Sequence, residues 1–279
     1  MKNVCTDTLT TPFLAWLAAP YFDWWSNPES LQTLERATGG PWWLVGGSAF
    51  VMFVAWTACY IVSFRQARRD ASYGFPIVNV ALNLGWEVVF AFALVGPLPR
   101  FYFPLQWGHL MWVAFDLMNV YQIFRYGRGM QTSAFTRRWF LPIVLGTFAL
   151  AGPATYFFIL YTRDVMGVNS AMIIDVVMAA LFINMFANRV ALRGLSFWGG
   201  VLRLVGDVAS FVFLYLWWPA QFDAQGAFAT CQVPAYAHVL EPPSYVFLYG
   251  MFAAATVLDA LYVALLLARR RNVRQSATS

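Results

Sequence analysis

The apolar run FPIVNVALNLGWEVVFAFALV, at residues 75–95, contains no basic residue and a single acid, Glu87. An α-helix needs roughly 20 mainly apolar residues to cross the ~30 Å hydrocarbon core of a bilayer, and this run is that long. It therefore predicts a transmembrane helix. The same run places one carboxyl group among apolar neighbours, so it bears on function as well as on fold.

Six more apolar runs of similar length flank this one along the chain. Charged residues make up only 11% of the 279 residues, against about 25% in an average soluble domain. So few charges could not solvate the surface of a soluble fold of this size. The sequence therefore predicts an all-α integral membrane protein, a seven-transmembrane-helix bundle with spans at residues 42–63, 75–95, 107–125, 139–161, 168–188, 197–218 and 245–267.

The N-terminal part of the chain does not follow this pattern. Lys2 is followed by a polar run, and Pro12 and Pro20 interrupt the apolar part, unlike a secretory signal peptide. The aromatic residues of this part indicate an interfacial helical segment that lies on the membrane. We expect three parts, which are an extracytoplasmic interfacial segment at residues 1–41, the seven-helix domain at 42–268 and a basic cytoplasmic tail at 269–279.

Basic residues lie mostly at alternate ends of the predicted spans. With the C-terminus placed in the cytoplasm, thirteen arginines fall on the inner side, whereas the outer side holds only Lys2, Arg36, Arg100 and Arg163. This positive-inside pattern predicts an outer N-terminus, in a plasma membrane if the protein is bacterial or an ER-type membrane if it is fungal. The net charge of +5 then indicates contact with membrane lipid and no nucleic-acid partner. The thirteen are Arg65, Arg68, Arg69, Arg125, Arg128, Arg137, Arg138, Arg189, Arg193, Arg269, Arg270, Arg271 and Arg274.

Five acids fall inside the predicted spans, where a charged side chain costs at least ~2.5–3.5 kcal/mol on insertion scales. They are Glu87, Asp116, Asp175, Asp207 and Asp259. With a rise of about 1.5 Å per residue, all except Asp175 fall within roughly 5 Å of the midpoints of their spans. Four acids at one depth on four helices predict one polar chamber near the midplane, with Asp175 somewhat nearer the outer surface.

Three of these acids have a structural explanation. Asp207 follows Arg203 by four residues on one helix face, so the two could neutralise each other, and we favour this explanation over catalysis. Asp116 and Asp175 could accept hydrogen bonds between helices. For Asp175 we favour that explanation, whereas for Asp116 structure and function stay equally open.

Glu87 and Asp259 have polar neighbours on their own helices but no basic one. Asn83 precedes Glu87 by four residues and can hold one carboxyl oxygen, and Tyr262 follows Asp259 by one turn. A carboxyl group in apolar surroundings favours its neutral form and can then act as a general acid. Spacing alone leaves structural and functional roles equally open for both acids.

No residue cluster indicates a metal or a cofactor. The chain has no group of acids suited to magnesium and diphosphate, and His109 and His238 fall in different segments near the outer surface, where we expect an interfacial or capping role. The single lysine, Lys2, lies outside the spans, which excludes a retinal Schiff base in the seventh helix. We therefore expect no metal and no cofactor.

Two motifs resemble those of a known family. Tyr73-Gly74 followed by Asn83-Leu84-Gly85-Trp86-Glu87, and the later run Leu258-Asp259-Ala260-Leu261-Tyr262, are similar to the signatures of the membrane-integral meroterpenoid cyclases. That family includes pyripyropene-type fungal cyclases and bacterial drimane-type indole alkaloid cyclases. The resemblance covers residues 42–268, with weaker similarities at Trp112, Asp116, Tyr121, Arg125, Arg203 and Gly206.

The resemblance implies a metal-free terpene cyclase that protonates the terminal alkene or epoxide of a prenyl chain, expected to be farnesyl, on an aromatic or indole head group. It implies that Glu87 and Asp259 handle the proton, without saying which of them donates it. Asn83 and Tyr262 would orient these acids, and Trp86 would line the pocket or contribute a cation–π face. Asp116, Arg203 and Asp207 are expected to bind the substrate or support the acids.

Two points stay open. An epoxide opens with a weaker acid than an alkene needs, whereas the bacterial relatives suggest an unoxidised farnesyl group, so the substrate end is undecided. A small proton-coupled transporter is the alternative function, because midplane acids would suit it too, although the first and last three predicted helices show no internal similarity. A receptor is less favoured. We expect a lipophilic prenylated small molecule and membrane lipid as partners, and no obligate protein partner.

Overall fold

The computed structural model describes residues 42–92, 94, 103–162, 164, 167–189, 192–223 and 242–276. These residues form seven α-helices and one short 3-10 helix, η2 (Gly127–Met130), and they contain no strand. Each predicted span corresponds to one helix, which confirms the all-α fold. The helices are α4 (Trp42–Arg69), α5 (Ile77–Ala91), α6 (Phe103–Tyr126), α7 (Ala134–Thr162), α8 (Val168–Asn188), α9 (Phe197–Asp223) and α12 (Pro242–Ser276).

Five of the described helices, α4, α7, α8, α9 and α12, are long and apolar enough to cross a membrane, whereas α5 is a shorter apolar helix. Large apolar side chains point outward from α7, as expected for contact with lipid, and Leu150 is 73% exposed. The count of seven spans stays a prediction, and the expected interfacial segment at residues 1–41 lies outside the described residues.

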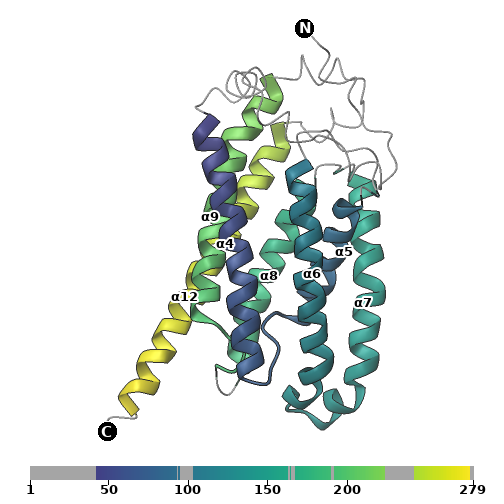
Figure 1. Cartoon of the computed structure of the whole chain (residues 1–279), viewed down its shortest axis with the longest axis vertical. Helices are drawn as coiled ribbons and strands as arrows, with labels where there is room; N and C mark the ends of the chain where they lie inside the picture. The colour runs from purple at the N-terminus through teal and green to yellow at the C-terminus, as the bar shows by residue number, and fades with distance from the viewer. Residues whose placement is uncertain are drawn as a thin grey trace.

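The helices lie side by side along the long axis of the molecule (Figure 1). On one side α4 packs against α9, and α9 against α12. On the other side α5 lies between α6 and α7, and α8 packs against both α12 and α5. The C-terminal part of α12 extends beyond the rest of the bundle (Figure 1). The buried faces of α4, α5, α6, α8, α9 and α12 line the interior.

Glycines allow two pairs of helices to approach closely, as small residues often do in membrane bundles. A Cβ atom added to Gly85 of α5 would lie 2.7 Å from the Gly152 Cα atom of α7. A Cβ atom added to Gly206 of α9 would lie 2.7 Å from Cδ1 of Trp56 on α4. Gly85 thus fixes the spacing of α5 and α7 two residues before Glu87.

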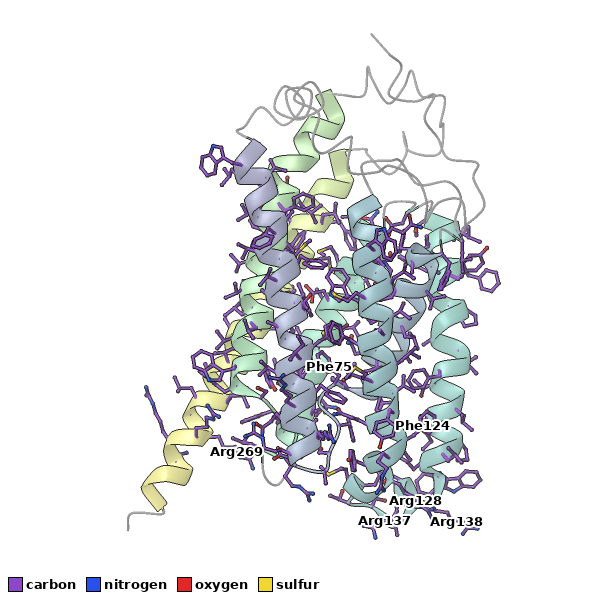
Figure 2. All side chains as sticks on the ribbon, viewed as in Figure 1. Phe75, Phe124, Arg128, Arg137, Arg138 and Arg269 are labelled. Carbon is purple, nitrogen blue, oxygen red and sulfur yellow. The ribbon has the colours of Figure 1, made fainter. Side chains whose placement is uncertain are left out.

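Arginines gather at one end of the bundle. Figure 2 shows Arg128, Arg137 and Arg138 together at the lower end, with Arg269 of α12 toward the same end. The arginines predicted for the inner side thus share one end where the structure describes them. The identity of that side as cytoplasmic stays a prediction.

Two loops at this end are tied together by an arginine that follows α8. Arg189 donates from Nη2 to the Tyr73 carbonyl oxygen at 3.0 Å, and its guanidinium carbon lies 4.6 Å from the centre of the Tyr73 ring. The Gly194 amide donates to Oδ2 of Asp70 at 2.7 Å. The Tyr73-Gly74 motif therefore anchors the loop that leads into α5.

Candidate active site

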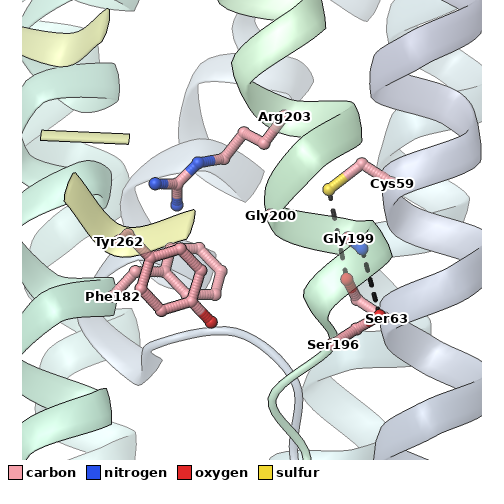
Figure 3. Close-up of a pocket in the computed structure, with 8 residues that line it drawn as sticks. All are labelled: Cys59, Ser63, Phe182, Ser196, Gly199, Gly200, Arg203 and Tyr262. Carbon is pink, nitrogen blue, oxygen red and sulfur yellow. Dashed lines mark hydrogen bonds between the residues drawn. The ribbon is translucent and has the colours of Figure 1, made fainter. Parts of the chain in front are cut away.

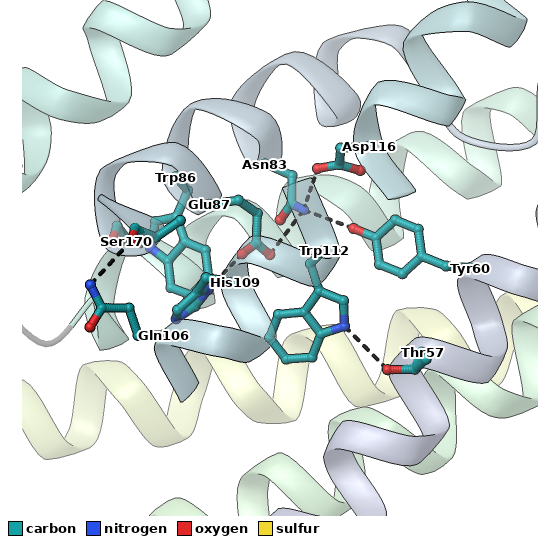
Figure 4. Close-up of polar contacts among 11 residues, drawn as sticks. Thr57, Tyr60, Asn83, Trp86, Glu87, Gln106, His109, Trp112, Asp116 and Ser170 are labelled. Atoms are coloured by element: carbon teal, nitrogen blue, oxygen red, sulfur yellow. Dashed lines mark hydrogen bonds and ion pairs between the residues drawn. The ribbon is translucent and has the colours of Figure 1, made fainter. Parts of the chain in front are cut away.

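Asn83 connects three helices around Glu87. One turn of α5 separates the two residues, and Nδ2 of Asn83 lies 3.5 Å from Oε1 of Glu87. The same amide donates at 2.8 Å to the Tyr60 hydroxyl of α4 and at 2.8 Å to Oδ2 of Asp116 on α6 (Figure 4). Asn83 therefore contacts Glu87 as its spacing predicts, but it holds Tyr60 and Asp116 more closely.

His109 contacts Glu87 directly. Its Nδ1 atom lies 2.6 Å from Oε2 of Glu87, and the two residues are only 2% and 3% exposed. The expected interfacial or capping role of His109 is therefore wrong, because the face of α6 that carries it packs against α5. His238 lies outside the described residues.

Two tryptophans flank the His109 ring. The Trp86 ring packs edge-on against it at 4.7 Å between centres, and the Trp112 ring does so at 5.7 Å. Trp86 donates from Nε1 to the Ser170 hydroxyl of α8 at 2.9 Å, and Trp112 donates to the Thr57 hydroxyl at 3.3 Å (Figure 4). The imidazole therefore has a defined orientation between two anchored indoles.

Asp164 in turn fixes Ser170. The buried Asp164 carboxylate accepts from the Ser170 amide at 2.6 Å, from its hydroxyl at 2.7 Å and from the Asn169 amide at 3.2 Å. These bonds satisfy amides at the start of α8, which otherwise have no partner within the helix. Burial raises the pKa of Asp164, and the hydrogen bonds from Ser170 partly offset this. A chain of contacts thus runs from Asp164 through Ser170 and Trp86 to His109.

Asp259 lies in a second polar cluster, with Arg203. Nε of Arg203 donates to Oδ2 of Asp259 at 2.6 Å, and Nη2 contacts Oδ1. Neither oxygen of Asp207 has a hydrogen-bond partner within the described part of the chain. The expected pairing of Arg203 with Asp207 is therefore wrong, since the guanidinium group turns across to α12 instead of along its own helix.

An aromatic tract joins the two clusters. The Tyr60 ring stacks on Phe75 at 5.0 Å, Phe75 meets Phe182 at 5.4 Å, and Phe182 meets Tyr262 at 5.3 Å. The guanidinium carbon of Arg203 lies 4.2 Å from the centre of the Phe182 ring. Where one chamber was predicted, the described residues thus form two polar clusters with aromatic rings between them.

A small pocket opens beside the second cluster. Figure 3 shows Arg203 and the rings of Phe182 and Tyr262 on one side, and Cys59 and Ser63 of α4 on the other. Gly199 and Gly200 form part of the wall, and a Cβ atom added to Gly200 would lie 3.1 Å from Cε1 of Tyr262. Apolar rings, one guanidinium group and small polar side chains therefore line this space.

Residues 40–255 match the family of Pyr4-like transmembrane terpene cyclases. The match covers most of the chain. The chain belongs to this family. It is accordingly a multi-pass membrane protein, and the described helices place Glu87, Asp259 and Tyr262 in its interior.

Several fungal members of the family are similar over part of their length. The chain is 35% identical over 77 residues to the Pyr4-family terpene cyclase mfmH of Annulohypoxylon moriforme, covering 27% of this chain and 29% of that protein. It is 31% identical over 117 residues to the terpene cyclase ascF of Acremonium egyptiacum, 41% of each. It is 28% identical over 173 residues to the terpene cyclase cle7 of Aspergillus versicolor, 59% of this chain and 69% of that protein. The chain thus matches less than half the length of the first two. No solved structure matches.

The site residues predicted for this family member fall into two groups. Asn83, Glu87, Trp86 and Asp116 lie in the first cluster, and Arg203, Asp207, Asp259 and Tyr262 lie in or beside the second. Asp175 is buried on α8, and Tyr121 is 59% exposed. The described residues contain no group of three Cys, His, Asp or Glu side chains that could hold a metal ion.

Sequence reasoning missed His109 and Tyr60 as neighbours of the candidate acids. His109 precedes Asp116 by seven residues, which is about two helical turns, so both lie on one face of α6. That spacing could have placed His109 with Asp116. No such spacing indicates Tyr60, because its partner, Asn83, lies on another helix.

Proposed function

We propose that this protein cyclises a prenyl chain, farnesyl in the simplest case, on an aromatic or indole head group. The reaction starts by protonation of the terminal alkene or epoxide and proceeds through carbocations. Membership of the family supports cyclisation, and the two buried acids, Glu87 and Asp259, support a proton-initiated route.

Glu87 and Asp259 have different partners, and this difference is the basis on which we assign their roles. Asp259 is ion-paired with Arg203, which favours its charged form and makes it a poor proton donor. Glu87 instead contacts an amide, Asn83, and an imidazole, His109. Glu87 is therefore the proton donor, and Asp259 is the anion that faces the positive charge as it develops.

The proposed steps conserve every atom. The O–H bond of Glu87 breaks, and its proton bonds to the terminal alkene carbon or to the epoxide oxygen. Inner double bonds then attack the electron-poor carbon and form the ring bonds. A C–H bond next to the last cation breaks, its electrons form a new double bond, and Asp259 takes the proton. Asp259 then releases its proton to solvent and Glu87 takes one up, which restores the starting state. The product has the same mass as the substrate.

The aromatic tract suits the intermediates of this scheme. Aromatic faces attract cations, and Phe75, Phe182 and Tyr262 lie between Glu87 and Asp259 in the chain of ring contacts. Apolar walls also exclude water that would end the reaction early. A positive charge formed near one cluster can thus move toward the other along aromatic surfaces.

The test is a product assay in membranes that contain the full-length protein. Farnesylated indole and farnesylated phenols would be added, each with and without a terminal epoxide, and products would be separated by chromatography with mass detection. We expect a new peak of unchanged mass from at least one substrate, absent with Glu87→Gln. No isomer from any substrate, with protein well expressed, would overturn the proposal and favour proton-coupled transport.

A further inference from the structure

The histidine beside the candidate acid is not part of either family motif. His109 contacts Oε2 of Glu87 at 2.6 Å, whereas the Asn83 amide reaches Oε1 only at 3.5 Å. The closest partner of this carboxyl group among the described residues is therefore the imidazole. The contribution of the imidazole depends on whether it stabilises the neutral carboxylic acid or the carboxylate of Glu87.

A carboxylic acid that gives up its proton leaves a carboxylate that can only accept hydrogen bonds. Removing such a charge from water is costly unless donors replace the water. A neutral imidazole can supply one N–H donor at Nδ1 when the proton lies on that nitrogen. A hydrogen bond from Nδ1–H to a carboxylate is charge-assisted and stronger than the bond to the neutral acid.

We propose that His109 is a positioning residue that donates its Nδ1–H to Oε2 of Glu87 and so stabilises the carboxylate left after proton transfer. This inference rests on the proposed function. In the step, the O–H bond at Oε1 breaks, the proton bonds to the substrate, and the electron pair stays on Glu87. His109 remains neutral throughout, so it neither gains nor loses a proton.

The surroundings of the ring favour this role. The imidazole is held edge-on between Trp86 and Trp112, and Trp86 is itself anchored by Ser170. The ring plane is thus fixed before the proton moves. A donor fixed in advance stabilises developing charge without having to reorganise.

A hydrogen bond from His109 also helps a buried acid to protonate a carbon–carbon double bond. Burial alone disfavours the carboxylate and makes proton transfer harder. A fixed Nδ1–H donor opposes this effect by stabilising the carboxylate. Because an alkene is a much weaker base than an epoxide, the alkene reaction depends more strongly on this stabilisation.

The experiment compares His109→Asn with His109→Leu in the full-length protein, using the alkene and epoxide forms of one farnesylated head group. An asparagine amide nitrogen occupies nearly the position of Nδ1, whereas leucine fills the space without a donor. We expect His109→Leu to lower kcat by about 100-fold, as removal of a donor to a developing oxyanion does, with little change in KM. His109→Asn should retain most of kcat, and the loss in His109→Leu should be larger for the alkene.

Two outcomes would overturn the inference while the wild type still forms the isomer. One is equal kcat for His109→Asn and His109→Leu. The other is a loss that appears in KM or thermal stability and is the same for both substrates. A wild type that forms no isomer would overturn the proposed function instead.

A direct measurement does not depend on activity. ¹⁵N NMR of histidine-labelled protein, with the two histidines distinguished by the His238→Gln variant, reports which ring nitrogen of His109 carries the proton. We expect a protonated Nδ1 at neutral pH. An unprotonated Nδ1 would overturn the inference whatever the assay shows.

Discussion

At the scale of single residues, the two candidate acids differ in their partners more than in their burial. Glu87 is 3% exposed and Asp259 is 0% exposed. Within the described part of the chain, only Asp259 has an arginine partner, Arg203. Substitution of the two acids should therefore have different consequences, although the family resemblance treats them as a pair.

Glu87→Gln should abolish cyclisation and leave the fold intact. The amide keeps the volume of the carboxylic acid but has no proton to donate, and loss of a general acid lowers rates by about 10²–10⁴. Product formation in membranes measures the rate, and thermal unfolding in detergent checks the fold. Asp175→Asn is the control and should keep most of the activity. Wild-type rates for Glu87→Gln would remove Glu87 from the mechanism.

Asp259→Asn should lose stability as well as activity. Removing one partner of a buried ion pair leaves the other charge unmatched, at a cost of about 3–5 kcal/mol. Replacing Arg203 by Gln in the same protein should restore much of the free energy of unfolding without restoring cyclisation. Recovery of activity in the double variant would show that Asp259 acts only by balancing Arg203.

The sequence predicted contacts within one helix, but it did not predict contacts between side chains on different helices. The Asn83–Glu87 contact follows from a spacing of four residues on one helix. The same rule predicted a pair between Arg203 and Asp207, but the arginine meets Asp259 on another helix. Spacing along one helix cannot show which of two nearby acids an arginine side chain will reach.

At the scale of elements, apolar length located the helices well but their ends less well. The run at 75–95 predicted a helix to Val95, whereas α5 ends at Ala91. Glu87 thus lies about one turn from the end of its helix, and not at the midpoint. Apolar composition does not mark a helix end that is still surrounded by apolar side chains.

Gly85→Ala should destabilise the bundle where α5 meets α7. The added methyl group would meet the Gly152 backbone at 2.7 Å, and such overpacking costs about 1–3 kcal/mol. Gly146→Ala on α7 is the matched control, because no described atom outside its own stretch of helix lies within 4 Å of its added Cβ atom. We expect that control to match or exceed the wild type in thermal unfolding, since alanine favours a helix by up to ~1 kcal/mol. Equal stability of the two variants would mean that the helices adjust freely here.

Asp164 should confer a pH dependence on the start of α8. Its folded-state pKa is raised by burial, so the folded state binds more protons than the unfolded state between the unfolded-state pKa, about 3.9, and the folded-state pKa. Stability from this group is therefore present at low pH and is lost as the pH rises through the folded-state pKa. Asp164→Asn should remove this dependence in detergent unfolding measurements, whereas Asp164→Ala should also lose about 0.5–2 kcal/mol from the missing acceptor. An unchanged pH profile in Asp164→Asn would rule out this origin.

At the scale of the whole molecule, the sequence indicated seven helices and one basic end, but not which helices are neighbours. The arginines of several loops do gather at one end of the described bundle, as Arg128 and Arg138 do in Figure 2. The packing of α8 against both α12 and α5 has no signal in the sequence. The apolar faces of different helices have similar compositions, so the order of helices around a bundle depends on how well the shapes of these faces fit together.

The basic end should lie in the cytoplasm. In a bacterial host, a green fluorescent protein fused after Ser279 should fluoresce, and alkaline phosphatase fused there should be inactive. Alkaline phosphatase fused after Arg100 should be active, because that segment is predicted to lie outside. Active phosphatase at Ser279 would reverse the predicted orientation, and activity at both positions would contradict the predicted number of spans.

The pair formed by Arg203 and Asp259 has a consequence for biosynthesis. The two residues are separated by 56 positions, so a ribosome completes α9 well before it completes the middle of α12. Until then two acids are available to this arginine, Asp207 one turn away on the same helix and Asp175 on α8, which is made earlier. Arrival of the last helix would then supply Asp259 as the final partner, so formation of this pair would mark the moment at which the newly made bundle closes.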